Sequence, residues 1–553
     1  MTDTHRASPL LALATLACAS LALAAAPALA AAPEHVPFAP RAGNPAATDR
    51  VIVKLRAAAT DRAFVQSAGS ASEAAAQARA AERMDALETR TGVPMRALRA
   101  ITPELHVLRL DAARDAADAA RAMAALRADA AVEYVEPDLR MFPHQQLPND
   151  PRFAAQWYLQ GVTSTPNGPT TSAVNAVGAW ALTQGSRGVV VAVIDTGVRF
   201  DHPDLGRAID GGKLLPGFDF VSAESNGGTL NANDGDGWDA DASDPGDWVS
   251  STDRQTAFFA DCETGDSSWH GTRVAGIVGA ATNNSTGIAG LGWNTWVLPV
   301  RALGKCGGFT SDIATAMRWA AGLPVSGVPT NPYPARVLNL SLGGEGSCSF
   351  TYSSAIDEIR ARGSVVIVSA GNDGSTVDQP ANCPGATAVA AVRHVGSKVG
   401  FSNLGPGVAI AAPGGNCVNI GPGDPCLFSI DTTTNLGRTG PGANDYTDQV
   451  NANFGTSFSA PIVSGVAALM LAVNGNLTPV QVVDRLRATA RPFPAVGEID
   501  PTTNQPIPQC RVPAGSGDTQ LQCNCTTQTC GAGLADAALA VGSALRPIAA
   551  VQA

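Results

Sequence analysis

The sequence has few charged residues and no excess of positive charge. Charged residues make up 15% of its 553 residues, against about 25% in a typical globular protein, and the net charge is −11. Acidic and basic residues balance within the first 143 residues, so the whole negative excess lies beyond them. A protein that binds nucleic acid needs the opposite sign, so we expect no nucleic-acid partner.

Long hydrophobic runs are absent apart from one at the N-terminus, and no unit of 20–50 residues repeats. His5 and Arg6 precede an apolar run that ends in an Ala-Leu-Ala cleavage pattern at residues 28–30. This pattern predicts a signal peptide over residues 1–30 and an extracellular, secreted protein without stable membrane insertion. Two alternatives are a permanent anchor, although Pro27 interrupts the run, and a lipoprotein modified at Cys18.

Cysteine is missing between Cys18 and Cys262, and the remaining ten cysteines all follow residue 260. An even number of cysteines in an exported chain predicts disulfides formed in an oxidising compartment.

Residues 31–145 have the pattern of a small separate unit. An Ala/Pro-rich linker over 31–50 leads into a pattern of strands and helices in the order βαββαβ. The expected strands cover 51–55, 95–101, 105–110 and 132–135, and the expected helices cover 72–89 and 112–128. This order predicts a ferredoxin-like α+β fold.

Residues 146–545 have the pattern of a larger α/β domain, followed by a short tail over 546–553. Continuous apolar runs, typical of strands buried on both faces, cover 189–194, 296–301, 337–340, 365–369, 386–392 and 408–411. Helical stretches separate several of these runs, so we expect a doubly wound, mostly parallel sheet. Two long polar loops, 221–268 and 414–455, interrupt the pattern.

Three motifs in this domain combine the residue types of nucleophilic catalysis. Asp195 follows a predicted buried strand, His270 opens a helical stretch in His-Gly-Thr, and Ser457 lies in Gly-Thr-Ser before an apolar helix. A serine hydroxyl is a weak nucleophile until a neighbouring base takes its proton, and a carboxylate can orient that base. The order Asp…His…Ser differs from the orders of the chymotrypsin and α/β-hydrolase enzymes.

On these motifs the sequence resembles the subtilisin-like serine peptidases (subtilases), in the secreted bacterial branch that carries an inhibitory propeptide. The resemblance implies Asp195, His270 and Ser457 as catalytic triad and Asn372, together with the Ser457 backbone N–H, as oxyanion hole. It also implies that the unit over 31–145 is an inhibitor of the chain's own catalytic domain and is removed by autoprocessing. The chain departs from the family at Arg273, where a second His is usual, and at Phe458, where Met is usual.

The resemblance further implies a substrate-binding segment around residues 340–344 and a pocket between it and residues 370–372. The residues it assigns to substrate binding are Ser341, Leu342, Gly343, Ala370 and Gly371. No acidic specificity residue is identifiable from the sequence, so we expect an endopeptidase that cleaves proteins and peptides broadly, with an apolar bias. We also expect the enzyme to be a monomer. A secreted esterase and a catalytically dead binding module are the alternatives.

A structural calcium ion is also implied by the resemblance, because residues 281–288 match the calcium loop of the family. The implied ligands are Asp150, Asp204, Ala281, Asn284, Thr286 and Ile288. The acidic segment 233–247 is either a second calcium site or a solvated loop.

The sequence alone permits many cysteine pairings. The pairing we expect is Cys262–Cys306, Cys348–Cys383, Cys417–Cys426, Cys510–Cys523 and Cys525–Cys530. A zinc cluster over 510–530 is the alternative, although no histidine accompanies these cysteines.

Overall fold

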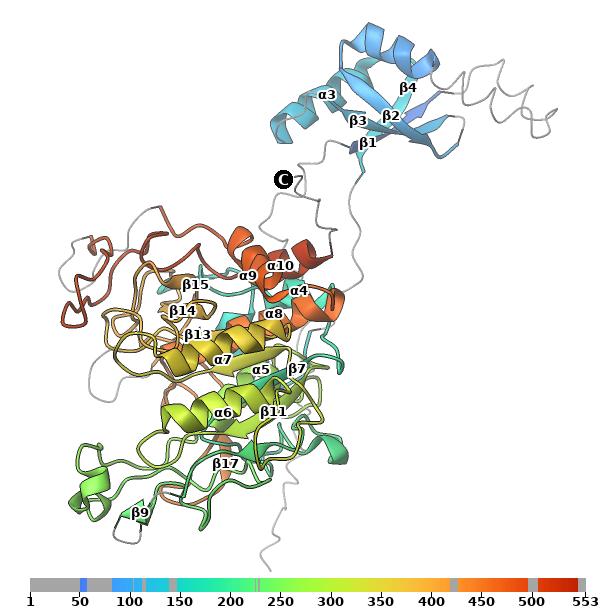
Figure 1. Cartoon of the computed structure of the whole chain (residues 1–553). Coiled ribbons are helices and arrows are strands. Elements are labelled where there is room, and N and C mark those ends of the chain that lie inside the picture. The colour runs from blue at the N-terminus through green and yellow to red at the C-terminus, as the bar shows by residue number, and fades with distance from the viewer. Residues whose placement is uncertain are drawn as a thin grey trace, which may run out of the picture. The chain divides into compact units, whose positions relative to one another are not determined.

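The computed structural model describes residues 50–56, 82–102, 104–111, 116–138, 147–223, 225–226, 229–417, 426–495 and 506–545 (Figure 1). The chain divides into two compact units, Met1–Met141 and Phe142–Ala553. The expected signal peptide, Cys18 and the tail over 546–553 lie outside the described residues, as does the linker up to residue 49.

The N-terminal unit contains a four-stranded antiparallel sheet in the order β2-β3-β1-β4. Its elements are β1 (Arg50–Leu55), a helical segment over 82–91, β2 (Met95–Ala100), β3 (Leu105–Leu110), α3 (Ala116–Ala128) and β4 (Val132–Pro137). Alternate residues of β1, Val51 and Val53, are fully buried against Leu87 and Leu126 of the helices. This is the expected ferredoxin-like order; residues 72–81 of the first expected helix lie outside the described part.

The second unit is built on a seven-stranded parallel sheet in the order β15-β14-β13-β12-β7-β11-β8. The strands are β7 (Val190–Asp195), β8 (Phe218–Asp219), β11 (Trp296–Arg301), β12 (Val337–Leu340), β13 (Val365–Ser369), β14 (Thr387–Val392) and β15 (Val408–Pro413). The expected parallel α/β sheet and its six apolar strands are confirmed. The two-residue strand β8 lies in a short apolar patch that predicts no strand.

Helices cover both faces of this sheet, which makes three layers (Figure 1). Val191 and Val193 of β7 pack on the side of α4 (Ala176–Trp180), α5 (His270–Gly279), α8 (Thr456–Val473), α9 (Pro479–Ala488) and α10 (Ala537–Ala544). Val190, Ala192 and Ile194 pack on the side of α6 (Thr310–Ala320) and α7 (Phe350–Ala361). The continuous apolar run of β7 is thus used on both faces of the sheet.

Short elements fill the connections. They are β5 (Ser164–Thr165), β6 (Gly168–Pro169), β9 (Ser225–Asn226), β10 (Thr229–Leu230), β16 (Thr433–Asn435), β17 (Asn444–Tyr446) and the 3-10 turns η1 (Phe153–Ala155), η2 (Trp157–Leu159), η3 (Ala208–Asp210), η4 (Asp253–Gln255) and η5 (Ala257–Phe259).

Helix α8 runs through the core of the second unit. Within the described residues it is the one helix long and apolar enough to cross a membrane, which the sequence analysis did not anticipate, but 83% of it is buried inside the protein. It packs against α5, α10 and strands β12 to β15. Its apolar side chains therefore pack in the core of a folded domain.

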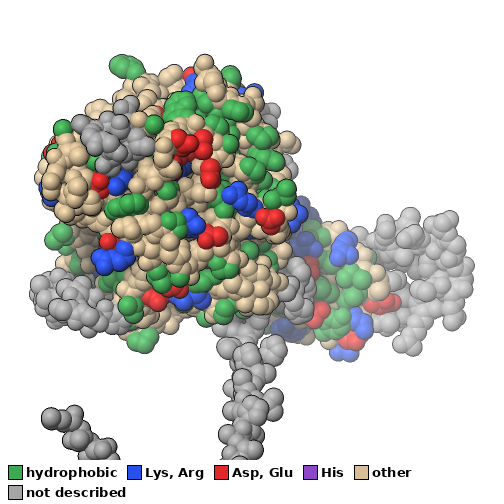
Figure 2. All heavy atoms as spheres, turned by 90° about the horizontal axis from the view of Figure 1, so that it is seen from below, with side chains coloured by type: hydrophobic (Ala, Val, Ile, Leu, Met, Phe, Trp, Pro, Cys, Tyr) green, Lys and Arg blue, Asp and Glu red, His purple; other side chains and the backbone are tan. Residues whose placement is uncertain are grey.

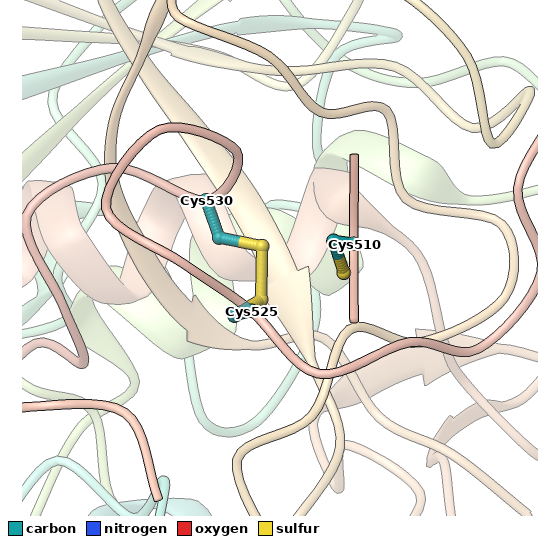
Figure 3. Close-up of side chains that lie close together, drawn as sticks. All are labelled: Cys510, Cys525 and Cys530. Carbon is teal, nitrogen blue, oxygen red and sulfur yellow. A yellow bond between two sulfur atoms is a disulfide. The ribbon is translucent and has the colours of Figure 1, made fainter. Parts of the chain in front are cut away.

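All five expected disulfides are present: Cys262–Cys306, Cys348–Cys383, Cys417–Cys426, Cys510–Cys523 and Cys525–Cys530. The sulfur atoms of Cys510, Cys525 and Cys530 lie within 4.8 Å of one another, and Figure 3 shows the bond that joins Cys525 to Cys530. Because every one of these thiols is consumed in a disulfide, none remains as a thiolate ligand, and the zinc alternative is wrong.

Charges of both signs are interspersed on the face of the molecule that Figure 2 shows. Acidic and basic side chains stand singly or in small groups among uncharged ones, and the described residues of this face form no continuous basic surface.

Candidate active site

The three motifs lie at the ends of three elements. Asp195 is the last residue of β7, His270 is the first residue of α5, and Ser457 is the second residue of α8. β7 lies inside the sheet between β12 and β11, so its carboxyl end is a place where open α/β sheets form sites. Helices α5 and α8 pack against each other. The backbone N–H groups at the start of α8 favour negative charge near Ser457.

The buried Asp195 carboxylate and the partly exposed His270 ring form a hydrogen-bonded pair. His270 Nδ1 lies 2.8 Å from Asp195 Oδ1, which also accepts a 2.8 Å hydrogen bond from the Thr196 backbone N–H. Burial alone would lower the pKa of His270, but the charge and hydrogen bond of Asp195 outweigh it and raise this pKa above 6.5. A carboxylate on Nδ1 leaves Nε2 as the free position of the ring.

Ser457 is nearly buried, and its hydroxyl donates a 3.2 Å hydrogen bond to the Ser341 carbonyl. Among the described residues no hydrogen bond joins it to His270. A serine hydroxyl rotates freely about χ1, and catalytic hydrogen bonds often form only when substrate is bound. The ring of Phe458, the next residue, lies 5.6 Å from the His270 ring between centroids, which places the start of α8 beside the imidazole.

A proline explains why Ser457 is hydrogen-bonded to the end of β12. Pro461 has no N–H, so it cannot donate the usual intrahelical hydrogen bond to the Ser457 carbonyl. Ser341 Oγ donates to that carbonyl instead, at 2.7 Å. Asn339 Nδ2 donates to Ser341 Oγ at 3.0 Å, and Ser464 Oγ donates to Asn339 Oδ1 at 2.9 Å. This buried network fixes the end of β12 against α8.

Asn372 is held by the same helix start. Its Oδ1 accepts hydrogen bonds from the backbone N–H and the hydroxyl of Thr456, both at 2.9 Å. Because the oxygen is occupied, the exposed amide group of Asn372 presents Nδ2 as a donor beside Ser457. Such a fixed donor can stabilise an oxyanion.

A cleft of about 460 Å³ lies beside His270. Three of the expected substrate residues, Ser341, Leu342 and Gly343, line it. Ala370 and Gly371 do not line this cleft; they lead from β13 to Asn372, and Gly371 accepts a hydrogen bond from the Thr456 hydroxyl at 3.3 Å. The two expected segments therefore reach Ser457 from β12 and from β13.

An aspartate that the sequence analysis missed lies between these two segments. The Asp378 N–H donates to the Ala370 carbonyl at 3.0 Å, and the next residue, Gln379, pairs with Gly344 through two backbone hydrogen bonds of 3.0 and 3.1 Å. Asp378 is only 8% exposed. No local pattern marks it, because its position depends on pairing with a strand end more than 30 residues earlier.

Arg273, one turn along α5 from His270, replaces the second histidine usual in the family. Its guanidinium donates to Thr434 Oγ1 at 3.1 Å and to Asn453 Oδ1 at 3.2 Å. It thereby joins α5 to the loop that precedes α8, and its positive charge partly opposes the rise in the His270 pKa.

The expected calcium residues lie close together, because the carboxylates of Asp150 and Asp204 accept hydrogen bonds from N–H groups of the loop 281–288. The carboxylates of Asp150 and Asp204 are 4% and 0% exposed, and neither forms an ion pair with a described Lys or Arg. Burial, together with the charge of Asp150, raises the pKa of Asp204 to about 6. In the described part of the chain, the carbonyls of Ala281, Thr286 and Ile288 accept no hydrogen bond. Buried carboxylates and free carbonyls are the oxygen ligands that Ca²⁺ prefers, so these residues fit the ion.

Several acids of the 221–268 loop have partners within the protein. Asp234, together with Asp219 of β8, pairs with the buried guanidinium of Arg301, and Asp244 accepts a 2.7 Å hydrogen bond from the Thr196 hydroxyl. No three carboxylates of this loop converge among the described residues.

Comparison with known families decides the relationship. The model of the family described as "Subtilase family" matches residues 186–533. The chain belongs to the subtilase family. The residues matched by the subtilase model include the seven strands of the parallel sheet and all three motif residues.

Several relatives of this subtilase are named proteases. It is 43% identical to an "Extracellular protease" of Xanthomonas campestris over 71% of this chain and 61% of the relative. It is 38% identical to an "Extracellular basic protease" of Dichelobacter nodosus over 65% of this chain and 55% of the relative. The chain thus spans less than two thirds of the length of either relative. It is also 31% identical to "Thermitase" of Thermoactinomyces vulgaris, over 58% of this chain and 85% of the relative.

A solved structure shows the same subtilase architecture. A protease from Pseudoalteromonas arctica is 40% identical and superimposes with a TM-score of 0.59, covering 72% of this chain and 100% of that one.

Proposed function

We propose that this subtilase is a secreted serine endopeptidase whose catalytic triad is Asp195, His270 and Ser457. The observation that carries the proposal is the 2.8 Å hydrogen bond between the buried Asp195 carboxylate and His270 Nδ1, at the start of a helix that packs against the Ser457 helix. This pairing holds the imidazole in the tautomer that can accept a proton at Nε2. The names of the relatives support the secreted location and the protease activity.

The reaction begins when the Ser457 hydroxyl rotates from the Ser341 carbonyl toward His270. Ser457 Oγ attacks the substrate carbonyl carbon while His270 Nε2 takes its proton, and Asp195 stabilises the resulting imidazolium. The Asn372 Nδ2 group and the Ser457 N–H donate to the oxyanion. His270 then protonates the leaving amine, and water releases the acyl group by the same steps in reverse order.

The substrate backbone binds along residues 341–344, beside the cleft at His270. Strand addition fits residues 341–343, because Gly343 is exposed and leaves room for a peptide main chain, whereas the backbone of Gly344 already pairs with Gln379. The assigned substrate residues are Ser341, Leu342, Gly343, Ala370 and Gly371.

Calcium stabilises the folded enzyme in this proposal and takes no part in the chemistry. The ligands are the carboxylates of Asp150 and Asp204, the side-chain oxygen of Asn284 and the carbonyls of residues 281, 286 and 288. In the structure Asn284 Oδ1 accepts a hydrogen bond from the Thr286 N–H, and Asn284 Nδ2 donates to Asp204.

The N-terminal unit over 31–145 serves as an inhibitory propeptide that follows a signal peptide over 1–30. The enzyme, residues 146–545, acts as a monomer after removing this unit. The support is the presence of a separately folded ferredoxin-like unit ahead of the subtilase domain.

A fluorophosphonate probe tests the proposed function. It labels the serine that a triad activates, so the secreted protein takes up one label and Ser457→Ala takes up none. Ser459→Ala, two residues along the same helix, is the matched control and keeps the label. Casein is degraded by the labelled form; p-nitrophenyl ester hydrolysis without casein cleavage identifies an esterase, and no labelling identifies a binding module.

A further inference from the structure

The backbone N–H of His270 is held by a carboxylate through one hydroxyl group. N–H groups in the first turn of a helix have no partner within the helix, and the His270 N–H donates to Ser268 Oγ at 3.3 Å. The Ser268 hydroxyl donates to Asp247 Oδ2 at 2.7 Å, and the Ser268 N–H donates to Asp247 Oδ1 at 2.6 Å. Both carboxylate oxygens of Asp247 therefore hold the residue two positions before His270.

A second connection of the same kind holds the next residue of α5. The Gly271 N–H donates to Thr196 Oγ1 at 3.0 Å, and the Thr196 hydroxyl donates to Asp244 Oδ2 at 2.7 Å. Asp244 is fully buried, and Thr196 directly follows Asp195. The segment 244–247 thus supplies one acid, through one hydroxyl, to each of the first two N–H groups of α5, where negative charge is favourable.

The backbone between Ser268 and His270 has a conformation that needs such support. Trp269 has a φ of +52°, which is unfavourable for a bulky side chain. Its ring is buried, and Nε1 donates to the Gly437 carbonyl at 2.7 Å. A strained conformation of this kind persists only where its surroundings hold it. Here Gly437 holds the Trp269 side chain and Asp247 holds the residue before it, so both control the direction in which the chain enters α5 at His270.

Asp247 also acts on the charge of the imidazole. The charged groups that face His270 are Asp195 on β7, Arg273 on α5, and Asp247 with the neighbouring Asp244 on the preceding loop. Burial lowers the pKa of His270, and Asp195 raises it. Arg273 opposes this rise in pKa, whereas the charge of Asp247 adds to it. Removal of the Asp247 charge should therefore make the imidazole less basic.

We propose that Asp247 is a positioning residue of the catalytic centre, which holds the His270 backbone through Ser268 so that the imidazole faces Ser457. The inference rests on the proposed peptidase function and gives one acid of the segment 233–247 a role in catalysis. Asp247 and Ser268 also line the cleft beside His270. A residue that positions the base affects the chemical step, so its loss should lower kcat and leave KM nearly unchanged, whereas a contact with substrate would change KM.

The test compares wild type with three variants in the hydrolysis of a peptide p-nitroanilide between pH 5 and pH 9. Enzyme concentrations are set by titration of the active serine. Asp247→Asn removes the charge and one of two acceptor oxygens, and Ser268→Ala removes the hydroxyl but keeps the charge. Asp241→Asn is the matched control, because the exposed Asp241 lies in the same loop and accepts from the N–H and hydroxyl of Ser243 in the same way.

We expect kcat to fall by about 10- to 100-fold in Asp247→Asn, the range for a small misplacement of a reacting group. The acid-side midpoint of its pH profile should also move to lower pH, because the imidazole has lost a neighbouring negative charge. Ser268→Ala should lose kcat as well but keep the wild-type midpoint, since the charge of Asp247 remains. Asp241→Asn should keep both the wild-type kcat and the wild-type midpoint.

Three results would overturn the proposal: an Asp247→Asn enzyme with wild-type kcat, a loss confined to KM, or a reduced kcat with an unchanged midpoint. If Asp247→Asn yields no titratable enzyme, Ser268→Ala decides, because a wild-type kcat in that variant contradicts the connection through the hydroxyl. Failure of the proposed function has a different signature, since the wild type then cleaves no peptide and no active serine titrates.

Discussion

Replacing Ser341 by Ala tests the connection between β12 and the catalytic helix. Ser341 Oγ donates to the Ser457 carbonyl at 2.7 Å and accepts from Asn339 Nδ2 at 3.0 Å. Ser341 is 3% exposed and Asn339 is fully buried, so water cannot easily replace the lost hydroxyl. The substitution leaves one carbonyl and one N–H without this partner.

Each buried polar group without a partner costs about 1–3 kcal/mol, so the two groups that Ser341→Ala leaves unpartnered cost about 2–6 kcal/mol in total. Pro461 cannot restore the bond to the Ser457 carbonyl, because it has no N–H. The start of α8 then shifts relative to the substrate segment, and we expect kcat/KM to fall by about tenfold or more, since small misplacements of reacting groups are costly.

Ser364→Ala is the matched control. Its hydroxyl is equally buried and donates to the Ala335 carbonyl at 2.7 Å, at the opposite end of β12 from the nucleophile. Both variants should unfold faster in denaturant when made in a Ser457→Ala background, which removes autolysis. Only Ser341→Ala should lose activity; equal activity losses in the two variants would refute the positional role of Ser341.

Four further outcomes are expected. Ser457→Ala should accumulate as a species that retains its N-terminal unit, as shown by intact mass; maturation of the purified variant would contradict autoprocessing. Chelation should lower the melting temperature and speed autolysis of the mature enzyme, because an ion bound only by the native state stabilises it; an unchanged melting curve after verified metal removal excludes the site. Mild peroxide should leave the activity of the wild type largely intact, since Phe458 has no thioether, whereas it should inactivate Phe458→Met. Equal rates of inactivation in the two proteins would contradict this explanation. When kcat/KM is measured against pH, its decrease on the acid side should have a midpoint above pH 6.5, because His270 acts as a neutral base with a raised pKa. A midpoint below pH 6.5 would contradict the pairing with Asp195.

The peroxide prediction gains support from the burial of the remaining methionines. Beyond the N-terminal unit only Met317 and Met470 occur, and both are fully buried. Peroxide therefore reaches neither of them easily, and Phe458 itself is 4% exposed beside the His270 ring.

The strands of the sheet could be predicted because each is a continuous apolar run buried on both faces. Val189 to Ile194 illustrates this, since every residue of β7 is buried. The two-residue strand β8 could not be predicted, because its pairing with Val300 and Arg301 is set by the neighbouring strand.

Some residues of the candidate site could likewise be predicted from the sequence, and others could not. Asp195, His270 and Ser457 lie in local motifs that sequence patterns reveal. Asp378 carries no such motif, because its position between the two segments depends on the backbone pairing of Gln379 with Gly344. The acidic loop is a related case: the partner of Asp234 is the buried guanidinium of Arg301, which comes from a distant strand and cannot be read from the composition of the loop.

The sheet order also controls when this chain can become active during its synthesis and folding. β12 lies beside β7 in the sheet, yet the Ser341 that it positions contacts a helix 116 residues further along. Contacts between such distant segments form late, because closing long loops costs entropy before any packing compensates it. Ser457 therefore meets His270 only after the last strand of the sheet has been made. Under the proposed mechanism, a partly folded chain holds no assembled triad, which protects it from its own chemistry.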